Sequence, residues 1–200
     1  MLHHIEGKLY ERSGKALTNF DTALPASQSD LASETMKDPY IFDFLRIDEK
    51  AREKELEDAL VEHMSEFLLE LGLGFAYISR QVKLNIGREE FYLDLLMYHT
   101  KLHAYVAIEL KTGKFKAEYV GKMNVSLSGL DEQYKMPVDS PSIGLIICKS
   151  RDQIVAEYAL RDIDKPIGIS QYELSQALTK EFSSKLLSIN DIEKGLEEKK

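Results

Sequence analysis

Cysteine is scarce in this sequence, and Cys148 is the one thiol among its 200 residues. A single cysteine excludes an internal disulfide framework and any zinc site built from several cysteines. Because Cys148 follows two isoleucines in an apolar run, we expect a buried, inert thiol rather than a nucleophile. A chain of this kind is expected in the cytoplasm, where disulfides are rare.

Long apolar runs are also missing. None approaches the ~20 residues that cross a membrane, and the N-terminus lacks the apolar segment that directs secretion. We therefore expect no membrane partner. Positive charge is not in excess either, since the net charge is −8, and this argues against a protein that coats nucleic acid.

The residues that are present indicate one domain with terminal appendages. A length of 200 residues predicts one domain, and an apolar content of 44% is enough for a core. Residues 1–37 are polar and weakly periodic, with a Ser- and Thr-rich stretch at 22–35, so we expect an appendage or linker with few core contacts. The main domain is predicted at 38–182 and a charged, frayed tail at 183–200.

Hydrophobic periodicity predicts an α/β fold. A helical stripe predicts one helix over 48–71, capped by Asp48 and ended by Gly72. Strands are expected at 75–84, 91–98, 104–111, 142–148 and 166–170, with helices at 117–130 and from Tyr172 to Leu178. Residues 153–160 fit either a short helix or a strand.

Two of these strands form a predicted β-hairpin that carries charged residues among apolar neighbours. Side chains alternate across a strand, so Glu109 and Lys111 share one face. If the chain reverses near Lys101, Asp94 lies opposite Glu109, where the Cβ atoms of cross-strand neighbours are about 4.5–5.5 Å apart. Two carboxylates and one ammonium group then meet in an apolar sheet, which is costly unless the charges are paired or bind a metal.

The same residues also fit a plainer interpretation, a solvated strand face with a surface salt bridge. The neighbours of Asp94 and Glu109 are among the most apolar residues of the chain, and a solvated strand would not be expected to have them. We therefore favour a functional site.

Asp94 followed by Glu109-Leu110-Lys111 resembles the core motif of the PD-(D/E)XK nuclease superfamily. Segments at 38–45, 67–72 and 141–148, with Gly74, Phe75, Arg80 and Gln81 between them, resemble the YhcG-type bacterial family within that superfamily. The resemblance implies a restriction-endonuclease-like α/β fold, with a mixed central sheet flanked by helices, and hydrolysis of phosphodiester bonds in DNA. It also implies a separate N-terminal domain, which is mostly missing here.

The resemblance implies roles for individual residues. Asp94 and Glu109, with the carbonyl of Leu110, are expected to hold Mg²⁺ or Mn²⁺, the ions that hard oxygen ligands favour. Lys111 is expected to position the attacking water. Nucleases of this superfamily often place a glutamate of the preceding helix near the metal, and we choose Glu57, with Glu53 and Glu62 as alternatives.

Other polar residues surround this group. Gln81 is expected either to hold a water or phosphate near the metal or to be an exposed strand residue. Between Ser79 and Lys122 the sequence has eight basic and five acidic residues, and this local excess can attract phosphates. The expected nucleic-acid contacts are Arg80, Lys83, Lys114, Lys116 and Lys122, and ordinary surface lysines are the competing interpretation.

One residue departs from the family pattern. Relatives commonly carry a glutamine where this chain has Lys122, a difference that bears on how the water is positioned and leaves metal binding intact. Two other functions stay open, a binding or scaffolding module without turnover and a carboxylate metal site for another phosphoryl substrate. The second lacks a nucleotide-binding loop. A homodimer is also open, and the sequence does not distinguish DNA from RNA.

Overall fold

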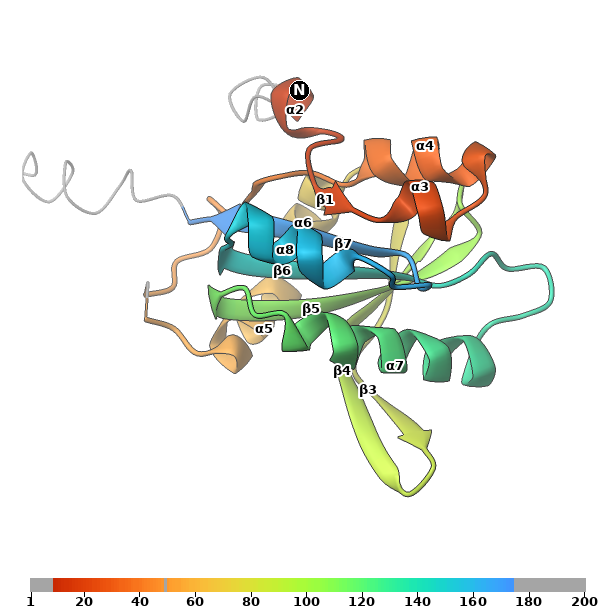
Figure 1. Ribbon diagram of the computed structural model, residues 1–200. Coiled ribbons are helices and arrows are strands. Elements are labelled where there is room, and N and C mark those ends of the chain that lie inside the picture. Colours follow the sequence, from red (N-terminus) through yellow and green to blue (C-terminus); the bar gives the residue numbers. More distant parts are fainter. Residues whose placement is uncertain (1–8, 49, 175–200) are drawn as a thin grey trace, which may run out of the picture.

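The computed structural model describes residues 9–48 and 50–174. Its centre is a seven-stranded mixed sheet in the order β1-β7-β6-β5-β4-β3, with β2 added beside β7 (Figure 1). The strands are β1 (Leu17–Thr18), β2 (Tyr40–Ile41), β3 (Phe75–Ile86), β4 (Glu89–His99), β5 (Ala104–Lys114), β6 (Ile143–Ser150) and β7 (Ile167–Glu173). The helices are α2 (Leu9–Arg12), α3 (Phe20–Ala23), α4 (Ala26–Thr35), α5 (Glu53–Glu62), α6 (Met64–Leu71), α7 (Glu118–Gln133) and α8 (Gln153–Leu160).

The direction of each strand follows from its connection. Short turns join β3 to β4 and β4 to β5, and both pairs are antiparallel. Helices α7 and α8 connect β5 to β6 and β6 to β7, and these pairs are parallel because a parallel pair needs a long crossover. The result confirms the expected mixed sheet flanked by helices.

Each face of the sheet has its own core. Leu95 and Ile108 point to the face covered by α3 to α6, where they join a cluster that includes Phe20 and Phe67. Leu96 and Ala107 point to the other face, under α7 and α8. Figure 1 shows α7 and α8 nearer the viewer than the strands and the fainter α5 and α6 behind them. This alternation is the strand parity that the sequence predicts, and it confirms that β4 and β5 are interior strands.

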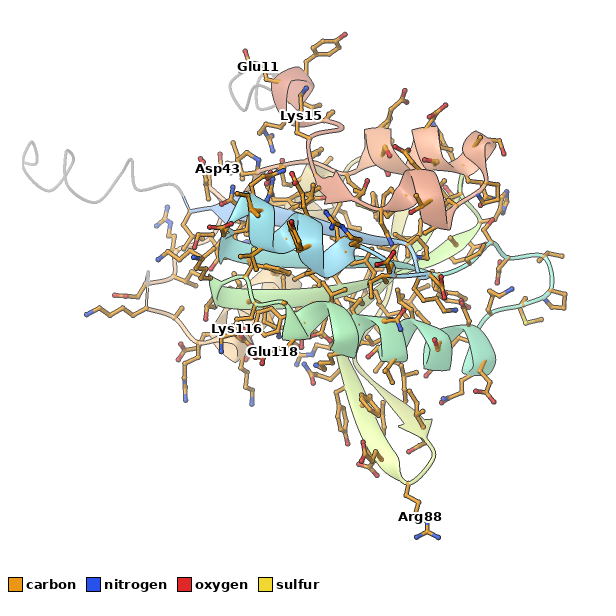
Figure 2. All side chains as sticks on the ribbon, in the orientation of Figure 1. Glu11, Lys15, Asp43, Arg88, Lys116 and Glu118 are labelled. Atoms are coloured by element: carbon orange, nitrogen blue, oxygen red, sulfur yellow. The ribbon has the colours of Figure 1, made fainter. Side chains whose placement is uncertain are left out.

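Beyond the reach of β5, strands β3 and β4 continue as a two-stranded arm. Their pairing runs from Phe75 and His99 to Ile86 and Glu89, whereas β4 and β5 pair only as far as Leu95. Figure 2 shows Arg88 at the tip of this arm, away from the body of the molecule. The base of the arm is therefore the place where β4 leaves β5.

Two predicted element boundaries are wrong. The helix expected over 48–71 is two helices, α5 and α6, which meet at His63. Helix α5 begins after Arg52, whose amide is held by the Glu55 side chain, and Asp48 instead accepts from the Lys50 amide. Gly72 does end α6, with a positive φ of 114°.

The C-terminal part also differs from expectation. Tyr172 lies in β7 and pairs with Tyr40 of β2, so no helix begins at this residue. Residues 153–160 form α8, whose N-terminus is capped by the Asp152 side chain accepting from the Val155 amide. Residues 175–178 of the expected helix and the expected tail at 183–200 lie outside the described residues.

The expectation that residues before 38 make few contacts with the core is wrong for the described part, from Leu9 onward. Phe20 and Met36 are fully buried, in the same core cluster as the apolar residues of α5 and α6. β1 pairs with β7, and the Arg12 guanidinium donates to the buried Glu70 carboxylate at 2.5 Å. Although this polar stretch shows only a weak periodicity in the sequence, its buried apolar residues are Phe20, Leu24, Ala32 and Met36.

No helix within 9–48 or 50–174 is long and apolar enough to cross a membrane.

Replacing Phe20 with alanine tests the packing of the N-terminal segment. Phe20→Ala should lower the free energy of unfolding by about 3–5 kcal/mol, since it empties a fully buried aromatic position. The measurement is equilibrium unfolding in urea. Tyr10→Ala is the control, because Tyr10 is 97% exposed and its loss should change the free energy by less than about 0.5 kcal/mol. Equal stabilities of the two variants would show that the segment is an independent appendage.

Candidate active site

The site lies where β4 and β5 separate. Their last paired residues are Leu95 and Ile108, so the next residues in the same register are Asp94 and Glu109. The Leu110 amide donates to Asp94 Oδ2 at 2.8 Å. The Asp94 side chain therefore binds the backbone of β5 just where the ladder of backbone hydrogen bonds has ended. This separation opens room for side chains between the strands.

Glu109 is the most deeply buried carboxylate of the site. The residue is 2% exposed, and a carboxylate at such a position requires positive partners. Lys122 Nζ donates to both of its oxygens, at 3.2 Å from Oε1 and 3.1 Å from Oε2. Lys111 Nζ lies 3.2 Å from Oε2. Two ammonium groups thus converge on one carboxylate.

Lys111 is held from three sides. Its ammonium contacts Glu109 on its own strand and donates to Glu53 Oε2 of α5 at 3.2 Å. The same nitrogen lies 5.4 Å from the centre of the Tyr119 ring on α7, within the range of a cation–π contact. Sheet and helices together fix the position of this charge.

Helix α5 supplies two glutamates rather than one. Glu53 and Glu57 are four residues apart and so lie on the same side of the helix. Glu57 is buried, and its carboxylate accepts a hydrogen bond from the Gln81 side-chain amide. Its role near a metal stays a prediction. Glu53, one of the two alternatives to Glu57, contacts Lys111. Glu62, the remaining alternative, is exposed at the end of α5.

Gln81 connects α5 to β4. Its side-chain amide donates to Glu57 Oε2 at 2.5 Å and lies 3.5 Å from Asp94 Oδ1. The backbone of Gln81 has a φ of 47°, in the left-handed region that non-glycine residues seldom adopt. A bulge in β3 between Tyr77 and Ser79 precedes it. Local strain of this kind is typical of residues whose side chain has a function.

The site carries more negative than positive charge. Its carboxylates belong to Asp94, Glu109, Glu57 and Glu53, and its ammonium groups to Lys111 and Lys122. Burial raises the pKa of Glu109, and the Asp94 carboxylate raises it further, while both lysines oppose this. When all six groups are ionised, their net charge is −2, which one divalent cation would neutralise.

The pKa values of Glu57 and Lys111 also reflect burial on one side and nearby charges and hydrogen bonds on the other. Burial raises the pKa of Glu57, against the hydrogen bond from Gln81, and Asp94 adds to the rise. Burial lowers the pKa of Lys111, but Glu109, Asp94 and Glu53 outweigh it and raise the pKa overall. Lys111 is therefore protonated at neutral pH.

The donors present fit a hard divalent cation. Carboxylate and carbonyl oxygens are the ligands that Mg²⁺ and Mn²⁺ prefer, and here they lie in a region short of positive charge. Within the part of the chain that the structure describes, no group of three or more His, Cys, Asp or Glu side chains is arranged to hold a metal. Asp94, Glu109 and the Leu110 carbonyl form the smaller set on which a metal would depend.

The basic residues expected to contact nucleic acid are mostly paired with acids. Arg80 contacts Asp58 at 2.8 Å and Lys83 contacts Glu90. Lys116 lies 3.6 Å from Glu118, and Figure 2 shows the two residues close together at the N-terminal end of α7. Lys122 is paired with Glu109, as described above. Lys114, at the end of β5, is exposed.

Sequence reasoning missed two features of the site. Tyr119 was not assigned a role, although its position three residues before Lys122 predicts that both face the same side of α7. Lys122 was expected to contact phosphate, and its pairing with Glu109 depends on how α7 crosses the sheet, which no local pattern reveals.

Comparisons with known proteins show which family the sequence matches. The family model described as the YhcG PDDEXK nuclease domain matches residues 33–187. The Escherichia coli (strain K12) protein named "Putative nuclease YhcG" is 32% identical over 163 residues, which are 82% of this chain and 44% of that protein. This chain therefore spans less than half the length of that curated relative.

Two solved structures show a distant likeness. A repair endonuclease from Pyrococcus abyssi is 19% identical, with a TM-score of 0.44 over 65% of this chain and 49% of that one. EndoMS in its dsDNA2 complex is 16% identical, with a TM-score of 0.43 over 67% of this chain and 47% of that one.

The raised pKa of Glu57 predicts how stability depends on pH. A carboxyl group whose pKa is raised in the folded state stabilises the fold below its ordinary pKa of 4.5, and this contribution is lost as the pH rises through the folded pKa. Glu57→Gln removes the titration and keeps an oxygen for the Gln81 amide. The variant should therefore gain stability relative to the parent as the pH rises above about 4.5.

The measurement is urea unfolding of parent and variant from pH 3.5 to 8 in a metal chelator. Glu62→Gln is the control, since Glu62 is exposed on the same helix. A difference between parent and Glu57→Gln that stays constant across this range would contradict the assignment.

Proposed function

We propose that this chain, which belongs to the YhcG nuclease family of the PD-(D/E)XK type, is a metal-dependent nuclease that hydrolyses phosphodiester bonds of DNA in the cytoplasm. The observation that carries the proposal is the meeting of Asp94, Glu109 and Lys111 at one point between β4 and β5. The single, buried Cys148 fits a cytoplasmic setting. A homodimer remains a prediction from the sequence.

Asp94, Glu109 and the carbonyl of Leu110 would hold Mg²⁺ or Mn²⁺. A divalent ion in such a site lowers the pKa of bound water and neutralises charge on the reacting phosphate. The Gln81 side-chain amide links Glu57 to Asp94, because it lies within hydrogen-bond distance of both carboxylates. We infer that Gln81 orients the Asp94 and Glu57 carboxylates, and that Glu57 serves the site either directly or through a water.

Lys111 acts as a charged donor rather than as a base. Its pKa is raised because Glu109, Asp94 and Glu53 outweigh the effect of burial, so the ammonium keeps its proton at neutral pH. A protonated lysine cannot accept a proton from water, but it can donate hydrogen bonds to a water or to a phosphate oxygen. Its three contacts keep the nitrogen where such a donor is needed.

The basic residues around the site support a nucleic acid as substrate. Arg80, Lys83, Lys114 and Lys116 lie on or next to the strands and helix that form the site, and three of them pair with exposed acids. Exposed ion pairs contribute little, so phosphates can replace the acidic partners. The alternative is a binding or scaffolding module that has the fold without turnover.

Separate variants of Lys111 and Asp94 test the mechanism. Lys111→Ala should lower the rate of DNA cleavage about 10²–10³-fold and leave Mg²⁺ binding in place, because it removes no oxygen ligand and Lys111 contacts only one of the two Glu109 oxygens. Asp94→Ala should lose metal binding as well as cleavage. Cutting of labelled single-stranded, duplex and branched DNA is followed alongside titration calorimetry with Mg²⁺.

A parent that cuts none of the three DNAs in the presence of Mg²⁺ or Mn²⁺ would favour the binding module. If Lys111→Ala cut as fast as the parent, Lys111 would be only an ion-pair partner of Glu109.

Salt dependence tests the basic surface. Lys114→Ala should make the slope of log affinity against log salt about 0.9 less steep for duplex DNA, the value for one lost phosphate contact. The control is Lys15→Ala, because Figure 2 shows Lys15 by the N-terminal helix α2, on the far side from Lys116. Fluorescence anisotropy in Ca²⁺ buffer measures both slopes. Identical slopes for the two variants would show that Lys114 does not contact a phosphate of the DNA.

A further inference from the structure

We propose that Lys122 is an internal counterion of Glu109 that a divalent metal ion must displace, so that this lysine sets how tightly the site binds metal. The inference rests on the proposed metal-dependent function and adds a competitor for the metal that lies within the chain itself.

The contacts of Glu109 carry the first step. Lys122 Nζ donates to both carboxylate oxygens, at 3.2 and 3.1 Å, whereas Lys111 contacts Oε2 alone. The Lys122 ammonium therefore lies in front of the carboxylate, across the direction from which a cation approaches two oxygens. A metal ion cannot occupy that position while the ammonium is there.

The two lysines differ in how firmly they are held. The Lys111 side chain is 9% exposed and also contacts Glu53 and Tyr119. The Lys122 side chain is 43% exposed, and its long stem lets the charged end reach water at small cost. Lys122 is therefore the partner that leaves when a metal arrives, while Lys111 stays.

The chemistry of the exchange is a competition between cations. A divalent ion brings twice the charge of an ammonium group and binds the same oxygens, and the site already has two carboxylates in excess of its ammonium groups. Metal can then bind only to those molecules in which Lys122 has left Glu109. The apparent dissociation constant rises in inverse proportion to that fraction.

The displaced ammonium remains near the metal. Lys122 lies on α7 and keeps its backbone position, so its side chain can turn toward the phosphate of a bound substrate. By linkage, an anion that engages Lys122 strengthens metal binding, and metal strengthens the binding of the anion by the same factor. Metal and DNA are thereby coupled through one residue.

Metal titration of Lys122 variants tests the inference. Calorimetry with Mg²⁺ and Mn²⁺ alone, on the full chain, should show Lys122→Met binding about tenfold tighter than the parent. Lys122→Arg, which keeps the charge, should stay near the parent. The control is Lys165→Met, which removes another ammonium paired with a carboxylate, Asp131, at the opposite end of α7.

Thermal unfolding provides an independent measurement. In chelator Lys122→Met should melt below the parent, because Glu109 loses one of its two ammonium partners. Added Mg²⁺ should raise the melting temperature of Lys122→Met more than that of the parent, since stabilisation by a ligand grows with its affinity. This comparison also shows that the variant is folded.

The outcomes separate this inference from the proposed function. If the parent binds metal, Asp94→Ala abolishes that binding, and Lys122→Met binds metal no tighter than the parent, Lys122 is no competitor and the inference is overturned while the metal site stands. If neither the parent nor Lys122→Met binds metal, or if binding does not depend on Asp94, the proposed metal site fails and the inference with it.

Discussion

The burial of the Glu109 carboxylate in the middle of an apolar sheet is the constraint on which the site depends. A carboxylate that is 2% exposed must find positive partners within the protein, and it finds them in Lys111 on its own strand and Lys122 on α7. Lys122 belongs to α7, and Lys111 also contacts Glu53 of α5 and the ring of Tyr119 on α7. One buried charge therefore connects β5 with helices on both faces of the sheet.

This burial is possible because the regular backbone pairing of the sheet stops at the site. The ladder between β4 and β5 ends at Leu95 and Ile108, and β3 and β4 continue away from the body as an arm. In the gap, Asp94 binds the Leu110 amide and Gln81 adopts a left-handed backbone that turns its amide toward Glu57 and Asp94. An unbroken sheet would have used these backbone groups for pairing and would have placed apolar side chains at the same positions. The departure from regular pairing coincides with the polar cluster, as expected where a site and a stable sheet make opposing demands.

Local patterns were enough to predict the parts of the site that lie on neighbouring strands. The parity of Glu109 and Lys111 and the register of Asp94 depend only on alternation and on one short turn, and the structure brings these side chains together as expected. The mixed sheet was likewise predictable from its apolar runs. Contacts that depend on the path of distant elements were not predictable: Lys122 on Glu109, Glu53 on Lys111, and the burial of Phe20 in the core cluster that α5 and α6 also line. The break at His63 also escaped prediction, because the apolar stripe of α5 continues into α6 without change of spacing.

The pairing of cations inside the site has a counterpart on the surface. In a chain with a net charge of −8, Arg80, Lys83 and Lys116 each contact an acidic neighbour, much as Lys122 contacts Glu109. Exposed pairs of this kind are weak and are screened by salt, so a polyanion with many phosphates can exchange with the acidic partners one at a time. A solitary anion gains too little to do so. Under the proposed function the same rule would govern both levels: a cation of the protein is already paired before its ligand arrives, and binding would be an exchange of partners rather than the filling of an empty position. Selectivity for a multivalent ligand, a divalent ion inside and a nucleic-acid backbone outside, would follow from that rule.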